Sequence, residues 1–174
     1  GDKPRNLTTP AKLYTRDAMF HGPRMQSVTE IVKVGDKQIA GSVQARPATG
    51  WFRDIVEPQF LIDPLLLDNG SQFVLFYLYE KELSATALLP FLIESIEIFR
   101  PREEFEGDAK GAAVLHSLTN KATEASVEIS DAFGVPWCRV NNIHSRRIAL
   151  PQEWLQFVHD PVGTKFGISE HGAV

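Results

Sequence analysis

The hydrophobic positions along the chain change period several times, which predicts strands on either side of one long helix. Apolar residues, most of them β-branched, stand among polar ones over residues 27–34 and again over residues 38–45, and Gly35 and Asp36 lie between the two runs. Short runs of this kind joined by a turn predict an antiparallel hairpin. We therefore expect the fold to open with two paired strands.

A long apolar stretch follows Asp63 and Pro64 and predicts a helix over residues 64–83. Asp63 is a favoured N-cap residue, and proline suits the first helical position because its fixed φ is already helical and its missing N–H costs nothing there. Apolar side chains then occupy most of the circumference, so the helix must be surrounded by other structure. They are Leu65, Leu66, Leu67, Phe73, Val74, Leu75, Phe76, Tyr77, Leu78 and Tyr79.

The second half of the chain has the alternation that is typical of strands. One strand is predicted after Pro90 and ends at the break formed by Arg100 and Pro101. Further strands are predicted at residues 114–118, 125–130 and 137–143, with a turn at residues 131–135. Five or six strands and one apolar helix predict an α+β fold in which an antiparallel sheet curls around the helix.

The length and composition predict one domain. Its 174 residues fit a single ordered unit over residues 13–150, with a flexible lead-in at residues 1–12 and an extension or linker at residues 151–174. The chain begins at Gly1 without an initiator Met, so we expect an excised piece or a processed end.

Charge and cysteine content narrow the class of partner and the compartment. A net charge of −4 without dense runs of one sign argues against nucleic-acid binding. No apolar run is long enough to cross a membrane. The single cysteine, Cys138, can form neither an internal disulfide nor a CxxC metal pair, so we expect a cytoplasmic protein.

A group of polar residues interrupts the apolar helix and is the main candidate for chemistry. Asp68, Asn69, Ser71 and Gln72 surround Gly70, and Asp68 and Gln72 share one face at a spacing of four residues. A carboxyl in apolar surroundings should have a raised pKa, so Asp68 could act as a general acid that Gln72 orients. Alternatively, the four polar residues cap, bend or solvate one helical turn. Gly70 would allow close approach of a backbone or a ligand.

Four segments resemble polyketide synthase dehydratase domains. Residues 62–72 (IDPLLLDNGSQ) are similar to that family's helix motif HPxLLDxxxQ, and residues 20–26 (FHGPRMQ) to the opening (Y/F)(H)GPxFQ of its second half. Residues 89–91 match its LPF segment, and residues 131–147 resemble its D-x-x-G-x-P…R ending. The motifs follow one another in the family's order over residues 14–150.

The resemblance implies a hotdog fold, in which a sheet wraps around a long helix. The family domain is a double hotdog whose first half carries a catalytic His in an HxxxGxxxxP motif and whose second half carries an Asp. This chain is similar to the second, C-terminal half. The resemblance implies that Asp68 protonates the departing β-hydroxyl, that Gln72 holds Asp68, and that a His from elsewhere removes the α-proton.

The implied product is an enoyl thioester on an acyl carrier protein. That carrier protein would be one partner, and another hotdog half, either an upstream segment or a second copy, would be the other. The carrier's phosphopantetheine holds the substrate, so no separate cofactor is implied. Two further functions stay open: a non-catalytic acyl-binding or scaffold half, and a homodimeric hotdog thioesterase or hydratase.

The chain departs from the family pattern at several positions. Asp63 stands where a His usually precedes the helix proline, Met25 replaces a Phe, and the first-half His motif is missing apart from a partial match at His159. Tyr14 stands where some members have a pocket tyrosine, although the spacing alone favours a core or interface tyrosine. His21 is either a substrate-binding residue or a buried imidazole bonded to the backbone.

The remaining polar residues give weaker indications. His116, His144 and His171 are scattered, and no HExxH, HxH or His–Cys cluster predicts a metal site. Arg146 and Arg147 could contact the phosphate of phosphopantetheine, or form a solvated strand end.

Overall fold

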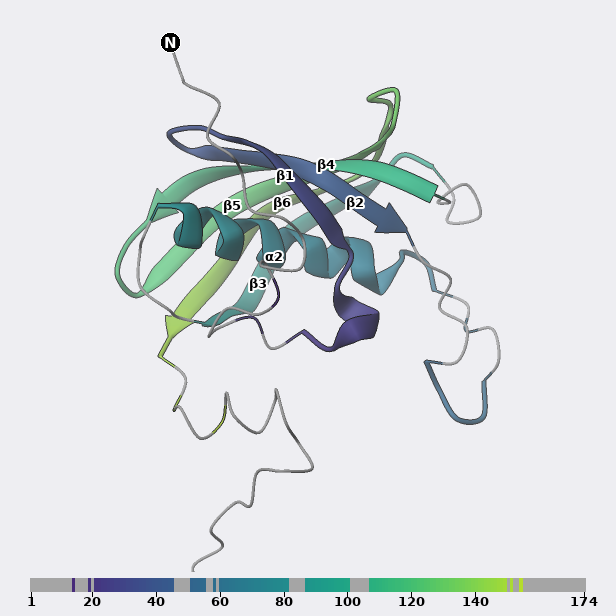
Figure 1. Cartoon of the computed structure of the whole chain (residues 1–174), viewed down its shortest axis with the longest axis horizontal. Helices are drawn as coiled ribbons and strands as arrows, with labels where there is room; N and C mark the ends of the chain where they lie inside the picture. Colours follow the sequence, from purple (N-terminus) through teal and green to yellow (C-terminus); the bar gives the residue numbers. More distant parts are fainter. Residues whose placement is uncertain are drawn as a thin grey trace, which may run out of the picture.

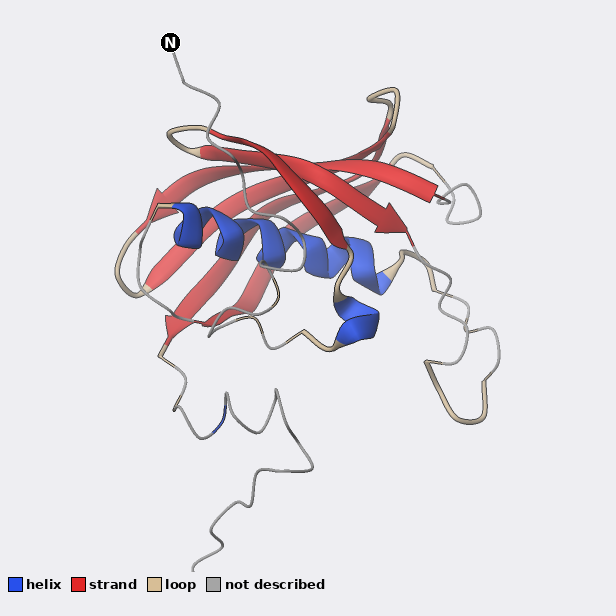
Figure 2. Ribbon diagram, viewed as in Figure 1, coloured by secondary structure: helices blue, strands red, loops and turns tan. Residues whose placement is uncertain are grey.

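The described residues of the computed structural model form a six-stranded antiparallel sheet and an α-helix (Figures 1 and 2). The structure describes residues 14, 19, 21–45, 51–55, 58, 60–81, 87–100, 107–149, 151 and 154. The predicted lead-in and nearly all of the predicted C-terminal extension lie outside these residues. The strands are β1 (Val28–Val34), β2 (Gln38–Ala45), β3 (Ala87–Ile98), β4 (Gly107–Leu118), β5 (Ala122–Asp131) and β6 (Pro136–Ile148). The helix is α2 (Pro64–Glu80), and a short 3₁₀ helix, η1 (Pro23–Met25), precedes β1.

The sheet curls around α2, as the hydrophobic pattern predicts. Its strand order is β1-β2-β4-β5-β6-β3, and every neighbouring pair is antiparallel. The helix lies along the concave face and contacts all six strands (Figure 2). This arrangement is the hotdog fold, and it buries an apolar helix with a single sheet.

Local chemistry explains where α2 begins and ends. The Asp63 carboxylate accepts a hydrogen bond from the Leu65 N–H at 2.8 Å, so Asp63 is the predicted N-cap. The helix ends at Glu80, three residues before its predicted end, and the backbone N–H of Lys81 bonds to the Tyr77 carbonyl oxygen. Within the described residues, no helix has the length and apolar character required to cross a membrane.

Glycines on the sheet allow α2 to approach it closely. Gly41 of β2 and Gly111 of β4 are register partners, and a Cβ on Gly111 would lie 2.2 Å from the Phe73 ring. The bare backbone of Gly111 therefore accommodates Phe73. On the helix, a Cβ at Gly70 would lie 2.7 Å from Ile143 Cδ1. Side chains of the sheet therefore approach Gly70, where the sequence led us to expect a backbone or a ligand.

The strands of the second half, β3 to β6, extend further than their sequence pattern predicted. β4 begins at Gly107 and β6 ends at Ile148. The inward positions at the start of β4 are Ala109, Gly111 and Ala113, and such small residues give little strand signal. β3 begins at Ala87 and includes Pro90, which is tolerated because β3 is an edge strand.

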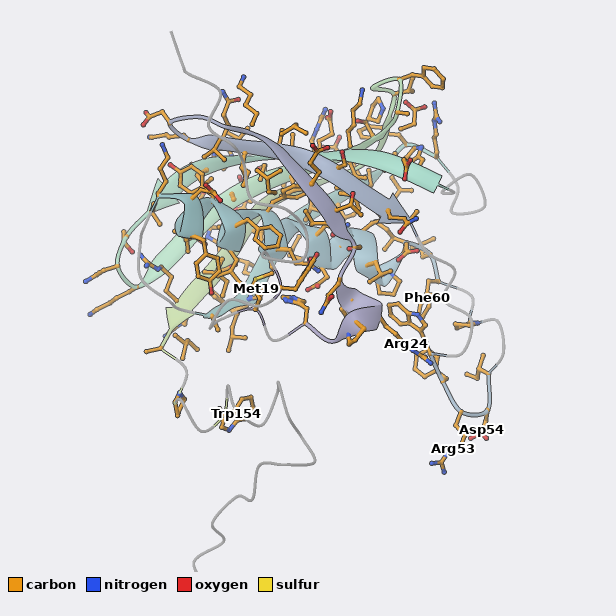
Figure 3. All side chains as sticks on the ribbon, in the orientation of Figure 1. Met19, Arg24, Arg53, Asp54, Phe60 and Trp154 are labelled. Carbon is orange, nitrogen blue, oxygen red and sulfur yellow. The ribbon has the colours of Figure 1, made fainter. Side chains whose placement is uncertain are left out.

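The connection between β2 and α2 carries a group of aromatic residues. The Phe60 ring packs against Trp51 and Phe52, with ring centroids 6.4 Å and 6.2 Å away. Figure 3 shows Arg53 and Asp54 at the far end of this connection, well away from the sheet and helix. The aromatic contacts join residues 51–52 to Phe60 across the turn that carries Arg53 and Asp54.

Candidate active site

The polar residues of α2 divide into two groups with different surroundings. Gln72 is fully buried, and its Nε2 donates to Asp68 Oδ2 at 2.7 Å, so the two residues spaced one turn apart are in contact. Asn69 is also fully buried, but it accepts a hydrogen bond from Ser27 Oγ at 2.6 Å. Asn69 thereby ties the helix to the start of β1, which is a structural role.

The segment before β1 folds over the same turn of the helix. The Met25 N–H bonds to the Gly22 carbonyl oxygen at 2.8 Å, and Gln26 Nε2 donates to the His21 carbonyl oxygen at 2.9 Å. This compact turn is the segment that resembles the family's HGP motif. It places His21 Nε2 3.1 Å from Asp68 Oδ2. It also places the Met25 carbonyl oxygen 2.9 Å from Gln72 Nε2, which donates to it.

Tyr14 joins this group from the interior of the molecule. Its side chain is buried, and its ring meets Phe76 edge to face at a centroid distance of 5.7 Å. The hydroxyl accepts a hydrogen bond from the Val28 N–H at 2.9 Å and donates to Gln72 Oε1 at 2.7 Å. Tyr14 is therefore a core tyrosine that also reaches the polar group, and its hydroxyl faces Gln72.

The carboxylate of Asp68 has one engaged oxygen and one open oxygen. His21 and Gln72 both contact Oδ2, and Oδ1 has no hydrogen-bond partner among the described residues. The Asp68 side chain is 28% exposed, whereas that of His21 is 9% exposed. Asp68 is therefore not enclosed in the apolar surroundings that the helix pattern indicated. It lies at the edge of the core, with an oxygen accessible to a reactant.

The other histidines of the described residues lie on the outer face of the sheet. His116 Nε2 is 2.8 Å from Ser126 Oγ, and His144 Nε2 is 3.1 Å from Glu94 Oε1. Both are on the face opposite α2, so neither reaches Asp68. His159 and His171 lie outside the described residues. Within the described residues, no three His, Cys, Asp or Glu side chains are grouped as a metal site would require.

Arg146 and Arg147 contact other groups of the protein, and Cys138 is buried. The Arg146 guanidinium lies over the Phe91 ring at 5.5 Å, and Arg147 Nη1 donates to the Thr119 carbonyl oxygen at 2.8 Å. Cys138 is fully buried, and burial raises the pKa of its thiol to about 11. A thiol in that state is a poor nucleophile.

A family model described as the polyketide synthase dehydratase N-terminal domain matches residues 3–152. The chain belongs to the polyketide synthase dehydratase family. The match covers the whole sheet, α2 and the candidate site. Its description names the N-terminal domain, whereas the motifs of this chain resemble the second half of the family's double hotdog. No curated protein matches the chain.

Solved structures of dehydratase domains have the same fold. The chain is similar to the dehydratase domain of PpsC from Mycobacterium tuberculosis, solved in complex with C12:1-CoA, with a TM-score of 0.66 and 16% identity over 82% of this chain and 52% of that one. For GphF dehydratase 1 the TM-score is 0.63 and the identity 19%, over 86% of this chain and 54% of that one. For the dehydratase domain of RzxB from Pseudomonas fluorescens the TM-score is 0.59 and the identity 18%, over 80% of this chain and 48% of that one.

The chain thus spans about half the length of the dehydratase domains that it matches. These similarities establish the hotdog fold that the sequence predicted.

Proposed function

We propose that this chain supplies the general acid of a dehydratase acting on a β-hydroxyacyl thioester carried by an acyl carrier protein. The observation that carries the proposal is the state of Asp68, whose carboxylate is held by Gln72 at 2.7 Å while 28% of the side chain is exposed. A general acid must be fixed by the protein and still reach the group that it protonates. Asp68 has both properties.

The proposed reaction is an elimination of water. A base removes the proton from the α-carbon, the electrons of that C–H bond form the double bond to the β-carbon, and the bond from the β-carbon to its hydroxyl oxygen breaks. The hydroxyl takes the proton of Asp68 and leaves as water. Asp68 ends as a carboxylate and the base ends protonated, so a proton must return to Asp68 before the next turnover. This chemistry requires no cofactor beyond the phosphopantetheine that holds the acyl chain.

In this proposal the base lies outside the described residues. His21 is the nearest histidine, but its Nε2 faces Asp68 and its Nδ1 is buried. We propose that the base is the His of a first hotdog half, and that this chain is the second, C-terminal half. The order of its HGP-like turn, its helix motif and its D-x-x-G-x-P ending supports that assignment.

The edge strand β3 supports a partner of the same fold. It is twelve residues long and pairs only with β6 among the described strands. From Leu89 onward its apolar side chains are exposed, among them Phe91 at 59% and Leu92 at 49%. A long apolar edge is normally covered in a native protein, because its free N–H and C=O groups otherwise recruit other chains. A second hotdog unit paired along β3 would cover this edge.

The edge can be tested by measuring association. The chain should form a dimer, or bind a first dehydratase half, and the variant Leu92→Lys should lose that association in analytical ultracentrifugation. Val32→Lys, at an exposed position on the opposite edge strand β1, is the matched control and should associate normally. A wild-type chain that stays monomeric and does not bind the first half would contradict the proposed pairing along β3.

Turnover tests the function itself. The complete natural protein should convert a 3-hydroxyacyl pantetheine thioester to the enoyl thioester, detected by mass spectrometry. Asp68→Asn should lower the rate by ~10²–10⁴-fold without unfolding the protein. Retained dehydration in Asp68→Asn would refute the role of Asp68, and thioester cleavage in place of water loss would favour the thioesterase alternative.

A further inference from the structure

The hydrogen bonds around Gln72 have directions that can be worked out from chemistry alone. A backbone carbonyl oxygen only accepts, so the Gln72 atom at 2.9 Å from the Met25 carbonyl oxygen must be the amide nitrogen. The second hydrogen of that nitrogen then points to Asp68 Oδ2 at 2.7 Å. The orientation of the Gln72 amide is therefore fixed by the backbone.

The other side of the amide is fixed by the same logic. Gln72 Oε1 faces the Tyr14 hydroxyl at 2.7 Å and can only accept, so Tyr14 must donate its single proton to it. The Tyr14 oxygen meanwhile accepts from the Val28 N–H at 2.9 Å. A one-way chain of hydrogen bonds thus runs from Val28 through Tyr14 and Gln72 to Asp68.

Together with His21, this chain decides which oxygen of Asp68 can carry a proton. Oδ2 receives a hydrogen from Gln72 and, with a hydrogen on His21 Nε2, a second one from His21, so both of its lone pairs are engaged. In that state a proton on Asp68 is on Oδ1, the oxygen that has no partner among the described residues. Oδ1 is the oxygen that the elimination needs, because the departing hydroxyl must meet the proton.

The same constraint assigns the state of His21. Its Nε2 lies 3.1 Å from Oδ2, and a lone pair on nitrogen would repel an accepting oxygen. While Oδ2 is unprotonated, Nε2 therefore carries a hydrogen that it donates to Oδ2. In this state His21 helps to orient Asp68, and its Nε2 cannot remove the α-proton of a substrate.

From these directions we propose that Tyr14 is a positioning residue for the general acid. Its hydroxyl locks the Gln72 amide, which keeps Asp68 Oδ2 as an acceptor and places the transferable proton on Oδ1. Tyr14 acts through Gln72 and does not bind substrate, which its burial in the core against Phe76 supports. The proposal rests on the proposed dehydratase function and adds to it the group that positions the general acid.

The first experiment compares two buried tyrosines whose hydroxyls are both hydrogen-bonded. Tyr14→Phe keeps the ring in the core and removes the bonds of the hydroxyl to Gln72 and to the Val28 N–H. Tyr77→Phe, on α2 like Gln72, removes a hydroxyl that donates to the Asp36 carbonyl oxygen and lies outside the chain of bonds. Tyr14→Phe should lower kcat at least about tenfold with KM unchanged, because the acid is misaligned while binding is intact. Tyr77→Phe should keep the wild-type kcat.

The outcomes separate this proposal from the proposed function. Loss of dehydration in Asp68→Asn together with a wild-type kcat in Tyr14→Phe would overturn the role of Tyr14 and leave the dehydratase function intact. A change in KM alone would also overturn it, because it would make Tyr14 a binding residue. Equal rates for Asp68→Asn and the wild type would overturn the dehydratase function and the role of Tyr14 with it.

A second measurement needs neither turnover nor a variant that folds. Nitrogen-15 NMR of the wild-type chain at neutral pH should show a hydrogen on His21 Nε2 and two hydrogen-bonded protons on Gln72 Nε2. A His21 ring with Nε2 unprotonated would overturn the proposed direction of the bonds, since Oδ2 would then have to donate.

Discussion

Two pairs of histidine and carboxylate side chains occur among the described residues, one against the helix and one on the outer face of the sheet. In each pair the histidine Nε2 lies 3.1 Å from a carboxylate oxygen. In the inner pair the His21 and Asp68 side chains are 9% and 28% exposed, and in the outer pair His144 and Glu94 are 24% and 50% exposed. The distance alone does not distinguish them.

The hydrogen bonds of the two carboxylates differ more than their distances. Both oxygens of Glu94 are engaged, because Oε1 contacts His144 and Oε2 accepts from Asn142 at 2.7 Å. In Asp68 only Oδ2 is engaged, and Oδ1 is left for another molecule. A carboxylate saturated by its neighbours stabilises a surface, whereas one held by a single oxygen can transfer a proton. The pattern of engaged and open oxygens therefore separates the candidate site from a surface ion pair.

Of the changes that compare the inner and outer hydrogen bonds, Gln72→Met should have the largest effect on the free energy of unfolding. It keeps the size of the buried side chain and removes its hydrogen bonds. It leaves the Tyr14 hydroxyl and the Met25 carbonyl oxygen without their partner, which should cost about 1–3 kcal/mol of unfolding free energy. Urea unfolding measures this cost. The matched surface variant Asn141→Ala removes bonds to Ser95 and Glu97 and should cost less than about 0.5 kcal/mol. Equal costs would show that the inner bonds are no stronger than surface ones.

A smaller effect should follow the ionisation of Glu94. The hydrogen bond from Asn142, and after it the one from His144, lowers the pKa of Glu94 below its usual value. A carboxyl with a lowered folded-state pKa adds stability above its unfolded pKa of about 4.3 and loses it as the pH falls through the folded value. The stability difference between the wild type and Glu94→Gln should therefore be full near neutrality and disappear in acid. Glu124→Gln, on β5, is the control, and a difference that persists in acid would contradict this cause.

The smallest effect is expected at Arg139, on the outer face. Its guanidinium contacts Glu128 at 2.6 Å and Glu97 at 3.5 Å, and the side chain is 42% exposed. Exposed ion pairs of this kind contribute little and weaken with salt. Arg139→Met should therefore destabilise the chain less than either change above, and by less again in high salt. A salt-independent loss would mean that packing over the Phe99 ring, and not charge, is what Arg139 contributes.

Much of the fold was predictable because its signals are local. The hairpin, the Asp63 and Pro64 start of α2 and the alternation of β5 all depend on neighbouring residues. The first half of β4 was not predicted, because its inward-facing alanines and glycine give little strand signal in the sequence. Their small size is explained only by the folded structure, in which Gly111 lies against the Phe73 ring.

The strand β6 contains a β-bulge that the local sequence did not predict. Asn141 and Asn142 both lie opposite Ser126, which forms a β-bulge, and Asn142 has a φ of +50°. Asparagine tolerates this left-handed backbone better than most residues. The bulge turns both side chains outward, where Asn142 meets Glu94.

The candidate site was predictable only in part. Asp68 and Gln72 are one helical turn apart, so their contact follows from the helix itself. The contact of His21 with Asp68 and the bond of Tyr14 to Gln72 join residues that are far apart in sequence. Only the completed fold brings them together, and the resemblance to a family motif was the available signal for His21.

The most direct test of Asp68 as general acid follows the β-hydroxyl oxygen itself. A 3-hydroxyacyl pantetheine thioester labelled with ¹⁸O at the β-hydroxyl should lose its label to water, which records cleavage of the carbon–oxygen bond even where the enoyl product does not accumulate. The comparison is between Asp68→Asn and Glu94→Gln in the complete protein. We predict that Asp68→Asn abolishes loss of the label and that Glu94→Gln loses it at the wild-type rate. Equal loss of the label from both variants would contradict the assignment of Asp68.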